Sequence, residues 1–287
     1  LDNHSVVVDV ETNGFDSYGM HQICGIGIGF GNNSDLYYFP FRHQQVGTNL
    51  PSECLSALIA WLNTTKHLVG YNIKFDLRFL EKEGLVVEDK DLVDVLTMVR
   101  LTEPSTVKDL DLTNTIKRSY GEKHASYDIE TKKLLRSNKW HKDFSMAPVD
   151  VLGPYCEKDV LYTAKLYNDR SKLIKDTNQG NVWKMQIALT KVLYVIEGHG
   201  IKINNKYVKE TIIKIEDRKT EILKRVLNLA GKEFNLNSTQ QLGEVLNERG
   251  IKSPEKTAKG KQSWNEAALV QINDPIAGYV RQYRALE

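Results

Sequence analysis

The sequence predicts an α/β fold, a mixed five-stranded sheet flanked by helices, followed by a mostly helical region. Two observations predict it. Strand-like runs open the chain and alternate with helical patterns up to about residue 100, and nearly every segment after residue 181 has a helical period. The chain has 287 residues, of which 41% are hydrophobic, so it can bury a substantial core in one large domain with a smaller appendage.

The predicted sheet begins with three β-branched or aromatic runs, at residues 6–10, 23–30 and 36–41, separated by Gly, Asn, Asp and Ser. Their short connections favour antiparallel pairing. After Pro51, apolar residues repeat with a helical period. A short buried strand at 67–72, a helix ended by Gly84 and a strand from 91 that leads into another helix complete this part. This order of elements is typical of the ribonuclease H-like architecture.

A helical pattern continues to about residue 177, interrupted by a polar, basic loop at 136–148. The turn-forming residues at 176–181 predict a domain boundary, which gives a first domain at 1–177 and a second at 178–287. In the second domain, regularly spaced apolar residues from 208 to 229 predict one long amphipathic helix. Another helix, capped by Asn237 or Ser238, ends at Gly250 and precedes the basic segment KSPEKTAKGKQS.

The net charge of +2 divides unevenly along the chain. Residues 181–287 contain 18 Lys and Arg against 12 Asp and Glu, whereas residues 1–180 contain 21 against 25. Such a division suits a protein with carboxylates at a metal site in one part and cations that hold a phosphate backbone in the other. Two unrelated solvated surfaces would give the same split.

Cysteine usage and hydropathy indicate the compartment. Cys24, Cys54 and Cys156 lie far apart without zinc-ligand spacing, so we interpret them as reduced packing residues in an intracellular, reducing compartment. No apolar run reaches the roughly 20 residues of a membrane helix, and the first residues lack the features of a signal peptide, so no membrane association is expected. The chain lacks an initial Met and begins just before an apolar strand. We therefore expect it to be part of a longer protein.

Two carboxylates lie on the first predicted strand. Because alternate residues of a strand point to the same face, Asp9 and Glu11 would lie side by side next to the apolar run at 6–8. Two ionised groups in such a place are costly unless a cation compensates them, and oxygen ligands suit Mg²⁺ or Mn²⁺. A carboxylate pair at an exposed strand end would be an ordinary solvated surface.

Two further elements add acidic side chains. Asp76 lies where a predicted strand meets a helix, and there it could act as a metal ligand or simply favour the helix dipole. Tyr155 and Asp159 are four residues apart in a helical stretch, which places them on one face. Such a pair is most often a structural hydrogen bond. The three elements together indicate a site more strongly than any one of them.

The motifs DVET (9–12), NIKFD (72–76) and YCEKD (155–159) resemble the three exonuclease motifs of the DEDD superfamily, which includes proofreading exonucleases and ribonuclease D. The histidine branch would place His where this chain has Pro154, whereas Tyr155 fits the tyrosine branch. The resemblance spans roughly residues 4–175. It implies a 3′→5′ exonuclease that releases nucleoside 5′-monophosphates with two divalent metal ions, Mg²⁺ or Mn²⁺.

The same resemblance implies the roles of the site residues. Asp9, Glu11 and Asp159 would hold one ion, Asp9 would also contact the second, and Asp76 would hold that ion partly through water. Tyr155 would orient the attacking water, because a phenol is a poor base at neutral pH. The implied substrate contacts are Thr12, Phe15, Asn72 and Phe75. Without the resemblance, Phe15 is equally well explained as a turn residue in the core.

The C-terminal part resembles the connection and thumb of the family A DNA polymerases, of the polymerase I type. The resemblance is carried by residues 189–204, 234–246 and 256–269. It implies that the long helix at 208–229 belongs to a thumb whose tip holds duplex DNA through lysines of the basic segment, Lys252, Lys256, Lys259 and Lys261. A solvated basic loop would have the same composition. Palm and fingers motifs do not follow, so we expect a partial thumb without a polymerase active site.

The resulting hypothesis is the proofreading exonuclease of a family A DNA polymerase, acting as a monomer on single-stranded or frayed DNA 3′ ends, with duplex at the thumb and the rest of the polymerase in the parent chain. The first alternative is a free-standing, ribonuclease D-like enzyme that trims RNA. The second is a nucleic-acid-binding module without catalysis, which the complete set of acids disfavours.

Overall fold

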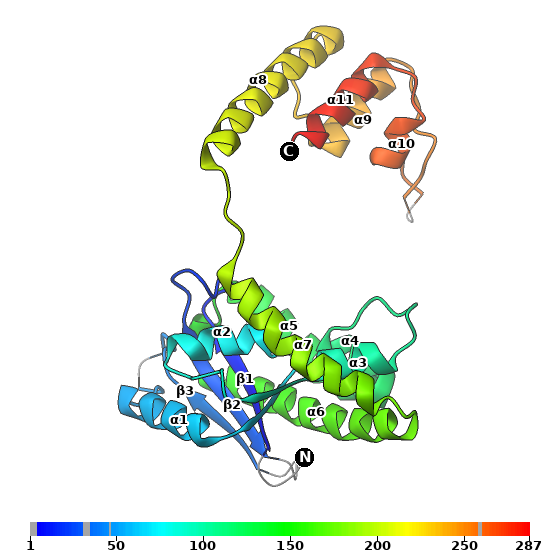
Figure 1. Ribbon diagram of the computed structural model, residues 1–287. Coiled ribbons are helices and arrows are strands. Elements are labelled where there is room, and N and C mark those ends of the chain that lie inside the picture. The colour runs from blue at the N-terminus through cyan, green and yellow to red at the C-terminus, as the bar shows by residue number, and fades with distance from the viewer. Residues whose placement is uncertain (1–4, 31–34, 46, 258–259) are drawn as a thin grey trace. The chain divides into compact units, whose positions relative to one another are not determined.

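The computed structural model describes residues 5–30, 35–45, 47–257 and 260–287. They form two compact units, Leu1–Gly200 and Ile201–Glu287 (Figure 1). The elements of the first unit are β1 (Ser5–Thr12), β2 (Ile23–Phe30), β3 (Leu36–Pro40), α1 (Ser52–Thr64), β4 (His67–Gly70), α2 (Lys74–Lys82), β5 (Asp91–Asp94), α3 (Val95–Thr102), α4 (Leu112–Tyr120), η1 (Glu122–Ala125), α5 (Ser126–Ser137), η2 (Phe144–Met146), α6 (Val149–Asp176) and α7 (Gly180–His199).

The sheet of the first unit has the strand order β3-β2-β1-β4-β5. β1 pairs with β2, and β2 with β3, in antiparallel fashion, whereas β4 pairs in parallel with both β1 and β5. The short links between the first three strands produce hairpin-type pairing, and α1 and α2 make the crossovers that parallel pairing requires. The predicted mixed five-stranded sheet is confirmed, with β1 at its centre.

Alternating side chains of β1 face two different cores. Val6, Val8 and Val10 pack with α1 and α2 on one face of the sheet. Val7 lies on the other face, where it packs with Val160 of α6 and with residues of α3. Since alternate residues of a strand share a face, Asp9 and Glu11 continue the line of Val7 toward α6.

Glycines of β2 allow α6 to lie close against the sheet. Gly27 is the register partner of Asp9, and a Cβ atom built on Gly27 would lie 2.6 Å from the sulfur of Cys156 and 2.8 Å from Val160. A Cβ atom on Gly29 would lie 2.5 Å from Val160. These separations are too short for real atoms, so the glycines set the approach of α6 to the strand that carries the two acids.

The two units divide at Gly200, later than the predicted boundary at 177. The prediction was wrong because the turn formers at 176–181 join two helices of the same unit. Tyr194 of α7 is buried in the core beneath α1 and α2, and Trp183 packs against the core on the α6 side. α7 therefore belongs to the first unit.

The second unit is helical, as expected. The amphipathic helix predicted at 208–229 is α8 (Asn205–Ala230), followed by α9 (Thr239–Glu248), α10 (Glu266–Val270) and α11 (Pro275–Ala285). Ser238 caps α9 by accepting a hydrogen bond from the Gln241 amide, and Gly250 follows this helix with a positive φ of 76°. Ile222, Leu246 and Trp264 lie in the hydrophobic core of the second unit. No helix among the described residues combines the length and the hydrophobicity needed to cross a membrane.

Candidate active site at the end of the central strand

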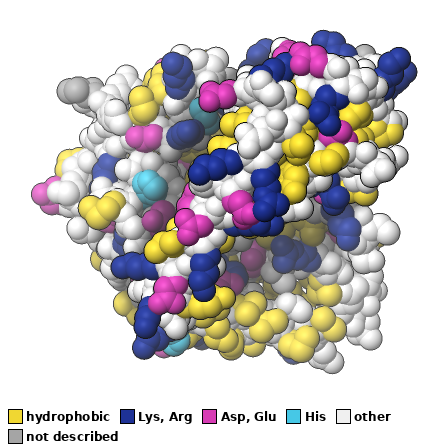
Figure 2. Space-filling model, turned by 90° about the horizontal axis from the view of Figure 1, so that it is seen from above, with side chains coloured by type: hydrophobic (Ala, Val, Ile, Leu, Met, Phe, Trp, Pro, Cys, Tyr) yellow, Lys and Arg dark blue, Asp and Glu magenta, His cyan; other side chains and the backbone are white. Residues whose placement is uncertain are grey.

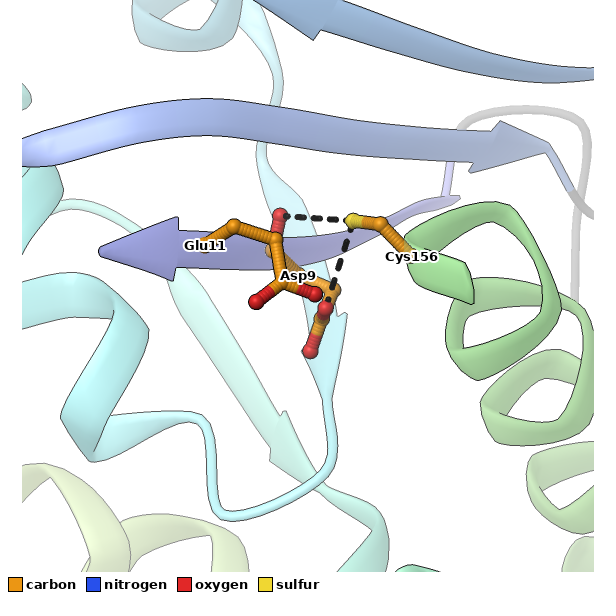
Figure 3. Close-up of side chains that lie close together, drawn as sticks. All are labelled: Asp9, Glu11 and Cys156. Carbon is orange, nitrogen blue, oxygen red and sulfur yellow. Dashed lines mark hydrogen bonds between the residues drawn. The ribbon is translucent and has the colours of Figure 1, made fainter. Parts of the chain in front are cut away.

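Asp9 and Glu11 lie side by side near the end of β1, on the face covered by α6 (Figure 3). Glu11 is buried, with 4% of its surface exposed, whereas Asp9 is partly exposed. The register pairs Asp9 with Gly27 and Glu11 with Gly25, and the pairing shifts between Glu11 and Thr12. The strand thus presents two carboxylates at the point where regular pairing ends, which is where a substrate can approach.

Cys156 of α6 contacts Asp9 directly. Its Sγ donates a hydrogen bond to Asp9 Oδ2 at 3.4 Å (Figure 3), and one ligand atom each from Asp9, Glu11 and Cys156 lie within 4.8 Å of one another. Burial, followed by the charges of Asp9 and Glu11, raises the pKa of this thiol well above its ordinary value, so it stays protonated. The interpretation of the cysteines as packing residues holds for Cys24, which is buried. It is incomplete for Cys156, which is buried but also bonds to Asp9, and it is wrong for Cys54, which is exposed.

Asp76 reaches the same place from the first turn of α2. It is 3% exposed, and its Oδ1 accepts a hydrogen bond of 2.9 Å from the Val10 amide, between the two acids of β1. The alternative interpretation, a carboxylate that only favours its own helix, does not explain this link to β1. Asp76 therefore belongs to the carboxylate cluster that Asp9 and Glu11 begin.

Asp159 and Tyr155 come from successive turns of α6, and each is bonded to α5. Tyr127 donates a hydrogen bond of 2.5 Å to Asp159 Oδ1, and Tyr155 donates one of 3.1 Å to Asp128 Oδ1. The alternative interpretation, a structural bond between Tyr155 and Asp159, does not hold for either hydrogen bond, because each residue is bonded to α5 instead. The sequence-based prediction did not include Tyr127 or Asp128, because only tertiary packing brings α5 to this face of α6.

The pKa values of all four acids are raised above their ordinary values. Burial raises the pKa of Asp9 from 3.8 to about 6, against the effect of the hydrogen bond from Cys156. Burial first, and then the charges of Asp9, Asp159 and Asp76, raise the pKa of Glu11. The pKa values of Asp76 and Asp159 are raised by burial and then by Asp9. Four carboxylates whose pKa values are raised in this way form a candidate site for compensating cations.

The donor set fits hard divalent cations. The ionisable oxygens come from Asp9, Glu11, Asp76 and Asp159, and oxygen ligands suit Mg²⁺ or Mn²⁺. Cys156 would favour a softer metal only as a thiolate, and its raised pKa keeps it a thiol that donates to Asp9. The residues present therefore fit magnesium or manganese better than zinc.

The four residues predicted to contact the substrate strand near these acids differ in their surroundings. Thr12 is buried and donates a hydrogen bond of 2.7 Å to the Gly14 carbonyl. Phe15 is 74% exposed, so its alternative interpretation as a core residue is wrong. Asn72 is exposed with a φ of 61°, and its backbone N–H donates a hydrogen bond to Asp94 Oδ1. Phe75 is partly buried against the core, with its ring 5.0 Å from that of Phe79.

A cavity of about 500 Å³ opens beside Asn72 in the first unit. Lys74 and Arg100 line it together with apolar side chains of α3 and α7. Lys74 also forms an ion pair with Glu197. Asp94 and Gln186 also line it, so its walls carry groups of both charges together with polar and apolar side chains.

The lysines of the basic segment lie in the second unit. Lys252, Lys256 and Lys261 are exposed, and Lys259 lies outside the described residues. Lys256 bridges to Gln262, and the Thr257 amide donates to the Lys261 carbonyl, so this segment folds back on itself. Figure 2 shows Lys and Arg side chains interspersed with Asp and Glu on the face that it draws.

The mixed sheet with acids on its central strand defines a ribonuclease H-like nuclease domain. Family comparison agrees: the model of the RNase H superfamily matches residues 6–170, and the model of DNA polymerase family A matches residues 205–287. The chain belongs to the RNase H superfamily, and its second unit carries a segment of the family A polymerases.

Curated relatives are DNA polymerases of bacteria and phages. The chain is 26% identical over 275 residues to DNA polymerase I of Chloroflexus aurantiacus, covering 92% of this chain and 28% of the relative. It is 24% identical to the DNA polymerase I of Pseudomonas aeruginosa, and the match covers 98% of this chain and 31% of that relative. The chain thus spans less than a third of these relatives.

A solved structure resembles the chain in fold. It is the POL domain of Pol1 from M. smegmatis in complex with DNA primer-template and dNTP, with a TM-score of 0.53 and 15% sequence identity. The match covers 99% of this chain and 45% of that one. This likeness supports the fold described above.

Proposed function

We propose that the first unit is a two-metal 3′→5′ exonuclease of the tyrosine branch of the DEDD superfamily, and that it proofreads for a family A DNA polymerase. The observation that carries the proposal is that Asp76 is bonded to the backbone between Asp9 and Glu11, and that the charges of Asp9, Asp76 and Asp159, from three elements, all act on Glu11. A structural role alone would not favour four acids that oppose one another's ionisation.

In the proposed reaction, Asp9, Glu11 and Asp159 would hold one ion, and Asp9 and Asp76 would contribute to the second. When bound, two divalent ions favour ionisation of a water and stabilise the leaving 3′-oxygen. The water oxygen bonds to phosphorus as the bond from phosphorus to the 3′-oxygen breaks. One water proton goes to solvent, and the 3′-oxygen of the shortened strand gains a proton. Tyr155 orients the water through its phenolic oxygen.

The substrate is proposed to be a DNA strand with a free 3′ end. Phe15, exposed beyond the end of β1, would separate the last bases, while Thr12, Asn72 and Phe75 contact the strand. The polymerase segment at 205–287 favours DNA over the ribonuclease D-like alternative. The four acids favour catalysis over a module that only binds nucleic acid.

The protein is expected to shorten 5′-labelled single-stranded DNA progressively from its 3′ end with Mg²⁺ or Mn²⁺, releasing nucleoside 5′-monophosphates. Gel analysis of the labelled strand and chromatography of the products measure this. Circular single-stranded DNA of the same composition is the control, because it has no 3′ end. Cleavage of the circle would contradict an exonuclease, and faster shortening of RNA of matched sequence would favour the RNA-trimming alternative.

The second unit is proposed to hold duplex DNA as a partial thumb. Replacing Lys252, Lys256 and Lys261 together by Gln should reduce the slope of log K against log salt for a primer-template by roughly 2–3, since each phosphate contact contributes about 0.9. Fluorescence anisotropy over a salt series measures the slope. The matched control replaces Lys206, Lys209 and Lys214 of α8, which are also exposed. An equal effect of both triple variants would reject a specific role for the basic segment.

A further inference from the structure

The first turn of α5 is bonded to both polar site residues of α6. Tyr127 and Asp128 are consecutive, and their partners Asp159 and Tyr155 are one helical turn apart. Residues four apart on a helix lie on the same face, so two adjacent residues of α5 can meet both. This contact fixes α5 against the part of α6 that faces β1.

Asp128 is itself held in place by three donors from three helices. It is 4% exposed. Its Oδ1 accepts from Tyr155 at 3.1 Å and lies 2.8 Å from Lys132 Nζ, while its Oδ2 accepts from Thr113 of α4 at 2.6 Å. A buried carboxylate that has donors on both of its oxygens, one of them charged, is held in a fixed position. Asp128 is thus a rigid acceptor for the Tyr155 hydroxyl.

This bond determines what the Tyr155 hydroxyl can do next. A phenol has one proton to donate and an oxygen that accepts. Since the proton is directed to Asp128, the oxygen is left to accept a hydrogen bond from a neighbouring group. A water molecule that donates to this oxygen has its own lone pairs free to face an electrophile.

We propose that Asp128 is a positioning residue for Tyr155: it takes the hydroxyl proton, so that Tyr155 accepts a hydrogen bond from the attacking water and aims that water at phosphorus. The inference rests on the proposed exonuclease function and extends it to a residue of α5. It differs from a purely structural role, in which Asp128 would only join α4, α5 and α6.

Asparagine and alanine at position 128 separate the two roles. Asp128→Asn keeps a carbonyl oxygen for Tyr155 and Lys132, and its amide can donate to Thr113 Oγ1 in place of Oδ2. Asp128→Ala removes the acceptor. Thr113→Val removes the bond to α4 and leaves the bond to Tyr155. A positioning role predicts that Asp128→Asn and Thr113→Val retain kcat within about twofold, while Asp128→Ala loses about tenfold in kcat with little change in KM.

A double-mutant cycle tests the proposal. Initial rates on single-stranded DNA give kcat and KM for wild type, Asp128→Ala, Tyr155→Phe and the double variant, with circular dichroism melts confirming that each is folded. If Asp128 acts through Tyr155, the double variant should be no slower than Tyr155→Phe. Should Asp128→Ala not fold, Asp128→Leu keeps the volume, lacks the acceptor and takes its place.

The outcomes distinguish this proposal from the one on which it rests. Multiplied losses in the double variant, an Asn variant as slow as the Ala variant, or an equal loss in Thr113→Val would each overturn the positioning role while wild type still releases nucleotides. If wild type releases none, the exonuclease proposal fails, and the role of Asp128 falls with it.

Discussion

Asp9→Ala combined with Glu11→Ala is expected to reduce nucleotide release at least about a thousandfold, equivalent to about 4 kcal/mol in the free energy of activation. The physical reason is that both carboxylates lie on the same face of β1, with Asp76 bonded to the Val10 amide between them and the charges of Asp76 and Asp159 acting on Glu11. Their removal halves the number of acids available to bind cations. Single-turnover release of a labelled 3′-terminal nucleotide at saturating Mn²⁺ measures the loss without interference from product release.

The matched control is Asp150→Ala, an exposed acid on α6 outside the cluster, which should retain the wild-type rate. The double variant should also bind single-stranded DNA through Phe15 and the other strand contacts. Such binding would show that the DNA-contacting surface of the double variant is intact. Undiminished nucleotide release by the double variant would mean that the chemistry depends on other residues.

The sequence alone was enough to predict the strand and helix that carry the acids. Alternation along β1 placed Asp9 and Glu11 on one face, and the structure shows Val7 of the same parity packed on α6. The spacing of Tyr155 and Asp159 placed both on one face of a helix. These predictions depend only on the periods of a strand and a helix, which are local properties.

Contacts between distant elements were not predictable in the same way. The bond from the Val10 amide to Asp76 spans 66 positions of sequence, and those from α5 to α6 depend on how the two helices pack. The glycines of β2 also determine a tertiary contact. Their alternation with Ile in ICGIGIGF is a signal for a smooth face against which a helix packs closely.

The domain boundary shows why turn chemistry is weaker evidence than burial. The segment at 176–181 has the composition of a linker, yet α7 returns to the sheet and buries Tyr194. Much of the apolar surface of α7 remains exposed, including Met185 at 57% and Ile196 at 57%. The sequence of this helix does not show whether the first or the second unit covers it. Only the tertiary contact assigns it to the first.

In the absence of divalent metal, the first unit is expected to become less stable as the pH rises from about 4 to 7. Burial raises the folded-state pKa of Asp9 from 3.8 to about 6. A group with a raised folded pKa contributes stability that is fully present below its unfolded pKa and is lost as pH rises through the folded one. For Asp9 this loss is on the order of 3 kcal/mol, or roughly 6–12 °C in Tm. Glu11, Asp76 and Asp159 act in the same direction.

Mg²⁺ or Mn²⁺ should reverse this loss, because a cation compensates the charges that the deprotonated acids acquire. Thermal unfolding with EDTA and with excess metal, at pH 5 and pH 7.5, should show a larger metal-induced rise in Tm at pH 7.5, where protons compete less. The variant with alanine at positions 9 and 11 is the control. It should be more stable than wild type at pH 7.5 in EDTA and respond little to metal. Equal metal-induced shifts at both pH values, or in both proteins, would show that the ions bind elsewhere, because only ligation by the acids of β1 couples metal binding to their protonation.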